Sequence, residues 1–421
     1  MEQLCLKRLR VHRDPESNKC KFLPLGKWRP ELTQADIPTP YMKITDSLDM
    51  VGVKLCATWS SSRAMNGEVL KQKVKQVIGS WRAGKFMDLN LRPISANTFA
   101  LSKVWFRCFT VNLREGDFAA INSSLKSWIY SDLLLKPEEM VLFRPVQKGG
   151  LGLASVKLKS LACLIRNFIE IAADPSFINS QYETSIYNYY VLDIQSQQPP
   201  PRPPFYTEYF FQAIKDANES GLDVMKMKIK QWYNFLLKRE YSDVIGDDLV
   251  VRPSRIELSD PSVLWDNIWK NVHLQILGNA EISFAWKLVH NLLTTEERVH
   301  ATVGNTSASC KFFCTDNSPA NLKHCLLSCD MSSDVGTWLI RIFQSISPAS
   351  TVNDMLRLQI FENDALLWIL VKSLFFCWCQ RMARKRALKS ECLSFLLADL
   401  MLLRETKYST IVEKVDEILN L

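Results

Sequence analysis

The stretch Cys310–Cys329 reads CKFFCTDNSPANLKHCLLSC and is the most informative segment of the chain. It holds four of the twelve cysteines and one of the five histidines. Three residues separate Cys310 from Cys314, and four separate His324 from Cys329. Structural Zn²⁺ binds four sulfur or nitrogen ligands in a tetrahedron, which leaves no open catalytic position. The spacing therefore predicts a structural zinc knuckle with Cys310, Cys314, His324 and Cys329 as ligands.

The third ligand has an alternative, because Cys325 directly follows His324. Residues four apart lie on the same face of a regular helix, so Cys325 would share a face with Cys329 better than His324 would. His324 is nevertheless favoured, since its ring reaches further from the backbone and a gap of four before the last cysteine is common in knuckles. A competing interpretation is that these cysteines are small buried hydrophobic residues.

Helical periodicity dominates the rest of the chain and predicts a mainly α fold. Leu70, Val74, Val77, Ile78 and Trp81 fall on one helical face. A second helix is expected to begin at Pro93, and another at Asp260–Pro261 that continues through Trp269. The chain after Asp354 is expected to be helical almost throughout. Five further helices are expected over about Asp117–Tyr130, Val156–Ala173, Thr207–Ala217, Leu222–Glu240 and Ile282–Leu293.

Small β elements are expected in two places. Met50–Leu55 (MVGVKL) resembles a short strand. In the segment FRPVQKGGLGL (143–153), the Gly149–Gly150 pair is typical of a tight hairpin turn.

The charge is uneven along the chain. The net charge is +8, and Val51–Ser160 holds 17 Lys and Arg against 7 Asp and Glu, a local balance of +10. A basic segment of this kind indicates either a polyanionic partner such as nucleic acid or a solubilising surface.

Other features exclude several classes of protein. Twelve irregularly spaced cysteines do not form a disulfide scaffold at this length, and Met1–Arg13 lacks the apolar core of a signal peptide. We therefore expect an intracellular, reducing environment. Ala365–Cys379 is the longest apolar run, interrupted by Lys372, and falls short of the ~20 residues that span a bilayer. It is interpreted as a buried helix, and no membrane partner is expected.

Several short segments, taken in order, resemble the C-terminal half of a non-LTR (LINE-type) retrotransposon reverse transcriptase. Met50–Leu55 is similar to a strand that follows the polymerase palm, and NTFALSKVW (97–105) to the helical thumb. RPVQKGGLGL (144–153) is similar to the family's "P…GGLGL" hairpin. FAWKLVHNLLTTEERV (284–299), followed by the Cys/His stretch, resembles the zinc-binding domain of such polyproteins. Family knuckles often have seven or eight residues before the histidine, whereas this chain has nine.

The resemblance implies a division into five parts. Residues 1–60 would be a remnant of the palm edge, and 61–175 a basic, helical, thumb-like domain. Residues 176–255 would be a connection containing the Pro-rich linker QSQQPPPRPP (195–204). Residues 256–345 would be the zinc-binding domain, and 346–421 C-terminal helices. The fold class expected is thus a helical thumb-like domain with small β hairpins plus a helical domain with a Cys-Cys-His-Cys knuckle.

The resemblance also implies that the chain is not an enzyme. The family's polymerase needs paired aspartates in a Tyr-x-Asp-Asp turn to hold Mg²⁺, and this chain resembles only the part that follows that turn. Asp247–Asp248 in VIGDDLVV (244–251) lies after the thumb-like region, which is the wrong order, and Asp and Gly are ordinary turn residues.

The function expected is therefore that of a nucleic-acid-binding, nuclear fragment of a transposable element, with structural zinc, RNA or DNA as partner and no small-molecule substrate. Lys and Arg of the thumb-like region would contact phosphates. The candidates are Lys71, Lys73, Lys75, Arg82, Lys85, Arg92, Lys103 and Arg107. The alternatives are a co-opted, zinc-dependent protein-interaction module and a decayed fragment with no selected function. A separate basic run, Arg381–Lys389, indicates either a nuclear-import or phosphate-binding patch or an exposed helix end.

Overall fold

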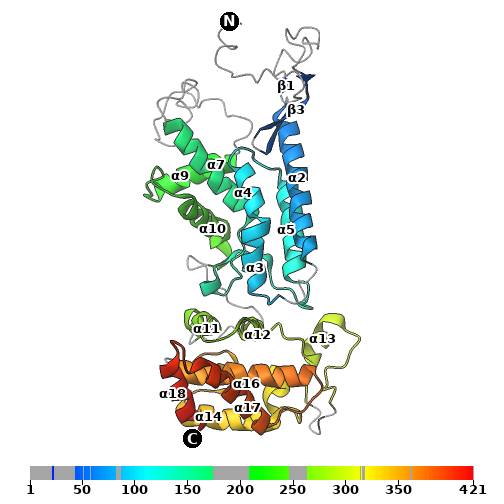
Figure 1. Ribbon diagram of the computed structural model, residues 1–421, viewed down its shortest axis with the longest axis vertical. Helices are drawn as coiled ribbons and strands as arrows, with labels where there is room; N and C mark the ends of the chain where they lie inside the picture. Colours follow the sequence, from blue (N-terminus) through cyan, green and yellow to red (C-terminus); the bar gives the residue numbers. More distant parts are fainter. Residues whose placement is uncertain are drawn as a thin grey trace. The chain divides into compact units, whose positions relative to one another are not determined.

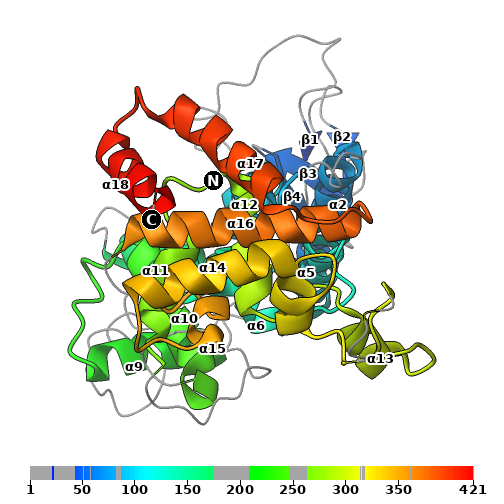
Figure 2. The same ribbon diagram turned by 90° about the horizontal axis from the view of Figure 1, so that it is seen from below.

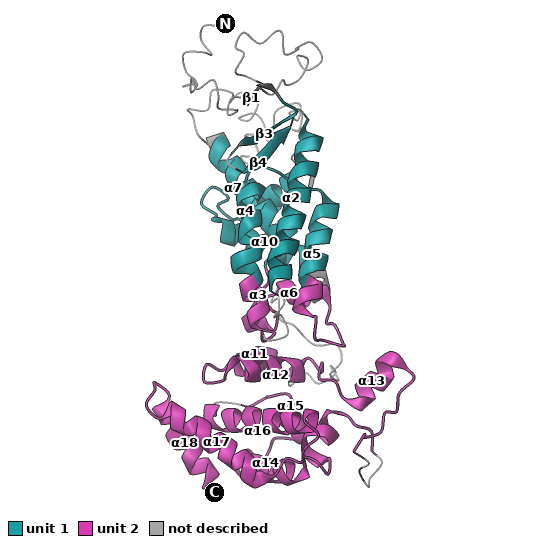
Figure 3. Ribbon diagram, turned by 45° about the vertical axis from the view of Figure 1, so that its right-hand side comes forward, with its two compact units in different colours: residues 1–81, 96–125, 154–240 teal, residues 82–95, 126–153, 241–421 magenta. Residues whose placement is uncertain are grey.

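The computed structural model describes residues 21–22, 43–50, 52–56, 58–81, 87–173, 208–245, 263–312, 314, 318–360 and 363–420. The chain divides into two compact units, coloured separately in Figure 3. The first unit comprises 1–81, 96–125 and 154–240, and the second comprises 82–95, 126–153 and 241–421. The segment 195–204 expected to be a linker and the Asp247–Asp248 pair lie outside the described residues. The predicted five-part division stays a prediction.

The first unit is a set of helices with a small hairpin at one end (Figure 1). Its elements are β1 (Lys21–Phe22), β2 (Lys43–Ile44), β3 (Ser47–Met50), β4 (Val53–Cys56), α2 (Trp59–Ser80), the π-helix η4 (Ala96–Ala100), α4 (Ser102–Cys108), most of α5 (Glu115–Ile129), α7 (Val156–Ala173), α9 (Glu208–Glu219) and most of α10 (Ile229–Ile245). Helix α2 contacts β4, η4 and α4, and α7 packs on α4 and α9.

The apolar face predicted for α2 is confirmed where its residues pack most tightly. Leu70 and Val74 are fully buried, as are Leu101, Val104 and Cys108 of the helical segment predicted from Pro93. The prediction for Val156–Ala173 matches α7 at both ends. Helix α7 has strong 3.6-residue apolar periodicity, so its apolar face was readable from sequence.

The single strand expected at Met50–Leu55 is wrong in detail. Met50 ends β3 and Val53 begins β4, and the two residues are paired in an antiparallel hairpin. Gly52 lies in the turn with φ +80°, a conformation that glycine adopts without the steric cost borne by other residues. The glycine therefore reverses the chain inside the apolar run.

The regular elements in the described part of the second unit are all helical. Its elements are α3 (Leu91–Ser95), α6 (Glu139–Phe143), the 3-10 turn η5 (Val146–Lys148), α11 (Trp265–Val272), α12 (Asn279–Val289), α13 (Glu296–Val303), the π-helix η6 (His324–Ser328), α14 (Ser333–Ile346), α15 (Val352–Leu356), α16 (Asp364–Met382), α17 (Lys389–Leu403) and α18 (Ser409–Leu419).

Helix α16 is the centre of this unit. It contacts α12, α14, α17, α18 and η6, and Figure 2 shows α14 running beside it. Lys372 is buried in the middle of the helix, where its ammonium group is 2.6 Å from Glu281 of α12 and also pairs with Asp399 of α17. The apolar run predicted to be a buried helix is confirmed as one, and its lone cation pairs with carboxylates of two neighbouring helices.

In the part of the chain that the structure describes, α16 is also the one helix long and apolar enough to cross a membrane by length and composition. Of its most apolar 18 residues, 72% are buried inside the protein. Burial of this degree is typical of a core helix.

The hairpin expected at Gly149–Gly150 is wrong, because residues 142–153 contain no strand. The segment forms η5 and then a tight loop, in which the Gly150 N–H donates to Pro145 O and the Leu151 N–H to Val141 O. A Cβ on Gly149 would lie 2.2 Å from the Trp269 ring, and one on Gly150 would lie 2.2 Å from Arg144 O. The two glycines are thus required for close approach to α11 and to the preceding chain.

Candidate metal centre

Three segments of the second unit bring the four predicted ligands together. Cys310 and Cys314 lie in the loop after α13, His324 begins η6, and Cys329 follows it. An antiparallel bridge between Ser309 and Pro319 closes the intervening loop. The four ligand atoms all lie within 4.8 Å of one another, and all four residues are buried. The side chains chosen from spacing are therefore close enough to hold one metal ion.

The three sulfur atoms form a nearly equilateral triangle. Their separations are 3.6 Å for Cys310–Cys314, 3.7 Å for Cys310–Cys329 and 3.4 Å for Cys314–Cys329. These distances are far above the ~2.0 Å of a disulfide bond. Sulfur ligands placed tetrahedrally about 2.3 Å from Zn²⁺ would be about 3.8 Å apart. The triangle thus has the size that a tetrahedral zinc site requires.

The π-helix η6 explains why His324 rather than Cys325 joins the cluster. The Cys329 N–H donates to His324 O at 2.7 Å, a bond that spans five residues. In a regular α-helix, residues five apart would be rotated by about 140° from each other. The wider π turn brings positions five apart onto one side, and such turns are frequent at functional sites.

The His324 side chain is oriented by a second contact. Its Nδ1 is 2.9 Å from the hydroxyl of Ser318, just before the strand bridge. Hydrogen bonding of one ring nitrogen orients the other toward a ligand, as in metal sites where a histidine binds through a single nitrogen.

Cys325 is buried but points elsewhere. Its thiol lies 3.5 Å from Ala320 O, to which it donates, and 3.9 Å from a carboxylate oxygen of Glu296. Burial raises the pKa of this thiol, so it stays protonated. Cys325 is thus part of the packing around the centre and not of the ligand group.

A buried arginine that was expected from sequence to lie in a surface patch contacts the cluster. Arg381, in the last turn of α16, is 2% exposed, and its Nη1 is 3.3 Å from the sulfur of Cys329. Its Nη2 is 3.7 Å from the sulfur of Cys310 and 2.6 Å from Glu296. The assignment of Arg381 to an exposed basic patch is wrong, because the fold turns it into the core.

The guanidinium of Arg381 also helps to set the charge of the cluster. Burial raises the pKa of the Cys310 thiol, but hydrogen bonds from the Phe312 backbone, His324 and Arg381 outweigh it and hold this pKa at about 7. Burial raises the pKa of Cys314 to about 12. The first thiolate of the cluster therefore forms at Cys310. No signal in the local sequence identifies this arginine, which lies fifty-two residues after Cys329.

The residues predicted to contact nucleic acid are dispersed. Arg82 and Lys85 lie outside the described residues. Lys73 and Lys75 of α2 and Lys103 of α4 are exposed. Lys71 is 2.7 Å from Glu68 and 3.3 Å from Asp117, so two carboxylates partly neutralise it.

Arg92 and Arg107 do not lie on an exposed basic face, which corrects the prediction for these two residues. Arg92 is 2% exposed and donates to Met87 O and Ile129 O. Arg107 is 8% exposed and donates to Gly52 O. Both guanidinium groups are buried and donate to backbone carbonyls, so they are not available to phosphates.

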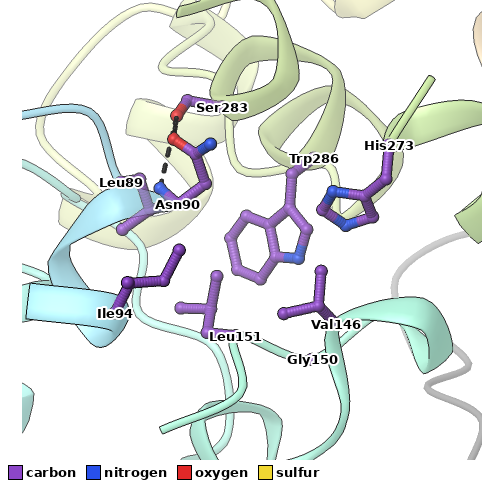
Figure 4. A pocket seen from close by; sticks show the side chains of 9 residues that line it. All are labelled: Leu89, Asn90, Ile94, Val146, Gly150, Leu151, His273, Ser283 and Trp286. Atoms are coloured by element: carbon purple, nitrogen blue, oxygen red, sulfur yellow. Dashed lines mark hydrogen bonds between the residues drawn. The ribbon is translucent and has the colours of Figure 1, made fainter. Parts of the chain in front are cut away.

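Trp269 and Trp286 pack on the loop at Gly149. The Trp286 indole donates to Gly149 O at 3.0 Å, and the His290 ring makes a second contact of 3.0 Å with the same oxygen. Next to them is a cavity of about 130 Å³, lined by Trp286, His273 and mainly apolar side chains (Figure 4). It is smaller than a typical ligand pocket.

Comparison with known protein families and with curated proteins found no match to the chain. Its function is therefore inferred from the geometry of the centre and from the distribution of charge.

Proposed function

We propose that the chain is a nucleic-acid-binding protein, without polymerase activity of its own, whose second unit is organised by structural zinc. The zinc part of this proposal rests on the cluster of Cys310, Cys314, His324 and Cys329, which are buried and whose ligand atoms lie within 4.8 Å of one another. Three thiolates and one imidazole form a ligand set that zinc prefers, and four protein ligands complete its coordination.

The chain's own residues match the charge of such a centre. Bound Zn²⁺ would supply two positive charges and fix the four ligands in one arrangement. Three thiolates carry three negative charges, and the buried guanidinium of Arg381 lies against two of them. Glu296 pairs with Arg381 and with Lys311. The summed charge of these groups is close to zero, as a buried site requires.

Elemental analysis of the purified chain tests the metal. We expect one zinc per chain, and loss of it in the double variant Cys310→Ser/Cys314→Ser. The matched control is Cys108→Ser, which alters a buried thiol of the first unit and should leave the zinc content unchanged. An absence of zinc in the wild type, or full zinc in the double variant, would refute the assignment.

Nucleic-acid binding is supported by charge. The local excess of +10 over Val51–Ser160 includes Lys73, Lys75 and Lys103, which are exposed. Among the described residues, no ion pair joins any of these three lysines to a carboxylate. Exposed cations of this kind neutralise phosphates and release counterions on binding.

A filter-binding assay over a salt series tests this part. We expect affinity for RNA or DNA to fall steeply with salt. For a single strand, each phosphate that is no longer neutralised should reduce the logarithmic slope by about 0.7. The triple variant Lys73→Met/Lys75→Met/Lys103→Met, which removes three cations, should reduce the slope by up to about 2.

The charge-matched control is a triple variant at other exposed lysines of the first unit, Lys215→Met/Lys226→Met/Lys228→Met. It removes the same number of charges and should keep the salt dependence of the wild type. No binding at low salt, or a flat salt dependence, would contradict the proposal.

A further inference from the structure

A basic pocket lies in the second unit, where the loop after α16 meets the first turns of α14. Its volume is about 370 Å³, within the range of small-molecule sites. Ser333, Thr337, Trp338 and Arg341 of α14 form one wall, and Arg386 and Lys389 form the other. These residues are exposed or half-exposed, so the pocket is accessible from solvent.

The wall from α14 is one face of the helix. Ser333, Thr337 and Arg341 are spaced by four residues, which places them in a row along the surface. The opposite face packs inward through Val335, Leu339, Ile342 and Phe343, all buried. The polar row and the Trp338 ring are therefore held in place by a buried apolar face.

The second wall is anchored to the segment that follows the metal ligands. Ala387 is fully buried, and its N–H donates to Met331 O at 2.7 Å. Ser332, the residue directly before α14, donates through its hydroxyl to Cys325 O at 3.1 Å. Arg386 thus directly precedes the buried Ala387, and both walls are hydrogen-bonded to the segment between Cys325 and Met331.

The pocket carries an excess of positive charge. It contains three cations, Arg341, Arg386 and Lys389, and one carboxylate, Asp334. Asp334 accepts the backbone N–H of Lys389 at 2.7 Å and so caps α17, whose own preceding residue Leu388 has no capping side chain. Within the described ranges, no ion pair involves Arg341 or Arg386.

These groups specify the chemistry of a ligand. Guanidinium groups bind phosphate oxygens through paired hydrogen bonds, and the hydroxyls of Ser333 and Thr337 add further donors. Trp338 provides an aromatic surface of the kind on which bases stack, with the ammonium of Lys389 5.8 Å from its ring centroid. A phosphate ester that also bears a flat ring uses both features.

We propose that this pocket binds a nucleotide unit, with its phosphate between Arg341 and Arg386 and its base against Trp338. The unit belongs either to a free nucleotide or to a single-stranded nucleic acid. This contact site rests on the proposed nucleic-acid binding and deepens it, and a test with two probes distinguishes the failure of one from the failure of the other.

The test measures binding of AMP and of a fluorescent uridylate dodecamer to the full-length chain. We expect Arg341→Met/Arg386→Met to weaken binding at least tenfold, and Trp338→Leu to weaken it less. The charge-matched control is Lys385→Met/Lys407→Met, which alters two exposed lysines outside the pocket and should bind as the wild type does. Thermal melting monitored by circular dichroism checks that each variant is folded.

The possible outcomes distinguish the sources. A tenfold loss for AMP supports a free nucleotide, and a loss confined to the dodecamer supports a strand. If the dodecamer binds equally to the wild type and the pocket variant, the pocket is refuted while nucleic-acid binding stands. If only AMP binds and the variant loses it, the pocket stands and nucleic-acid binding is refuted. Binding of neither probe, or equal binding of a polyglutamate peptide, overturns the pocket assignment.

Discussion

The Cys310–Cys329 loop and the Val141–Leu153 loop are two short segments of the same unit with equally conspicuous sequences. In the first, the four candidate ligands selected by spacing lie together. In the second, the Gly-Gly pair forms no hairpin turn: Gly149 packs against the Trp269 ring and Gly150 against Arg144 O. Metal ligands need only reach a common point within one short segment, whereas a hairpin needs two pairing strands. A glycine pair specifies backbone freedom but not its use.

The largest effect is expected when Cys329→Ser is compared with Cys325→Ser. Bound zinc contributes on the order of 10 kcal/mol to the folding of a short segment, so loss of a ligand should remove the metal and lower the melting temperature sharply. Cys325→Ser keeps a donor for Ala320 O and should cost no more than about 1 kcal/mol. Thermal melting with elemental analysis measures both. Retained zinc in Cys329→Ser, with loss in Cys325→Ser, would place Cys325 in the ligand set.

The second test concerns the glycine loop. Gly149→Ala places a methyl group against the Trp269 ring in a residue with φ +88°, and we expect a loss of about 2–5 kcal/mol. Gly221→Ala is the matched control, since Gly221 also has positive φ but nothing within 4 Å of the added methyl group. It should cost about 1–2 kcal/mol. Urea unfolding measures the free energy of unfolding of both variants. Equal losses would mean that the added methyl group does not clash with the Trp269 ring.

The third test uses pH to probe the same loop. Burial lowers the pKa of His290 to about 4 from an ordinary value of 6.5. Between about pH 4 and 6.5 the His290 ring is therefore protonated in the unfolded chain but not in the folded chain. The free energy of unfolding consequently falls as the pH drops from 6.5 to about 4. The loss is up to about 3 kcal/mol. His290→Gln keeps a donor toward Gly149 O and should show a weaker pH dependence of unfolding. Identical pH profiles for the two proteins would contradict this.

The smallest expected effect concerns Arg381. Arg381→Met removes the guanidinium from the sulfurs of Cys310 and Cys329 but leaves all four ligands in place. Groups that hydrogen-bond to ligands affect metal affinity by about 10–100-fold, so competition with a chelator should show a loss of that size. Lys385→Met, an exposed residue on the following loop, serves as control. Unchanged affinity in Arg381→Met would make the arginine a packing residue only.

The basic run Arg381–Lys389 shows that a charged residue in a sequence need not be exposed in the fold. Arg381 belongs to the interior beside the cysteines, whereas Arg386 and Lys389 line an open pocket. Helix α16 ends at Met382, so Arg381 belongs to the buried helix whereas Arg386 and Lys389 lie beyond its end. Arg92 and Arg107 lead to the same conclusion, since a cation in a helix can either donate to backbone carbonyls or face solvent.

Local patterns in the sequence predict the mainly helical fold, the apolar faces of α2, α4 and α7, the burial of α16, and the four side chains of the Cys/His cluster. These depend on periodicity and on spacing within one segment, which are local properties. The use of the Gly-Gly pair, the contact of Arg381 with the sulfurs, and the basic pocket are visible only in the folded protein. Each of these joins residues distant in the chain, and such contacts are set by packing rather than by local pattern.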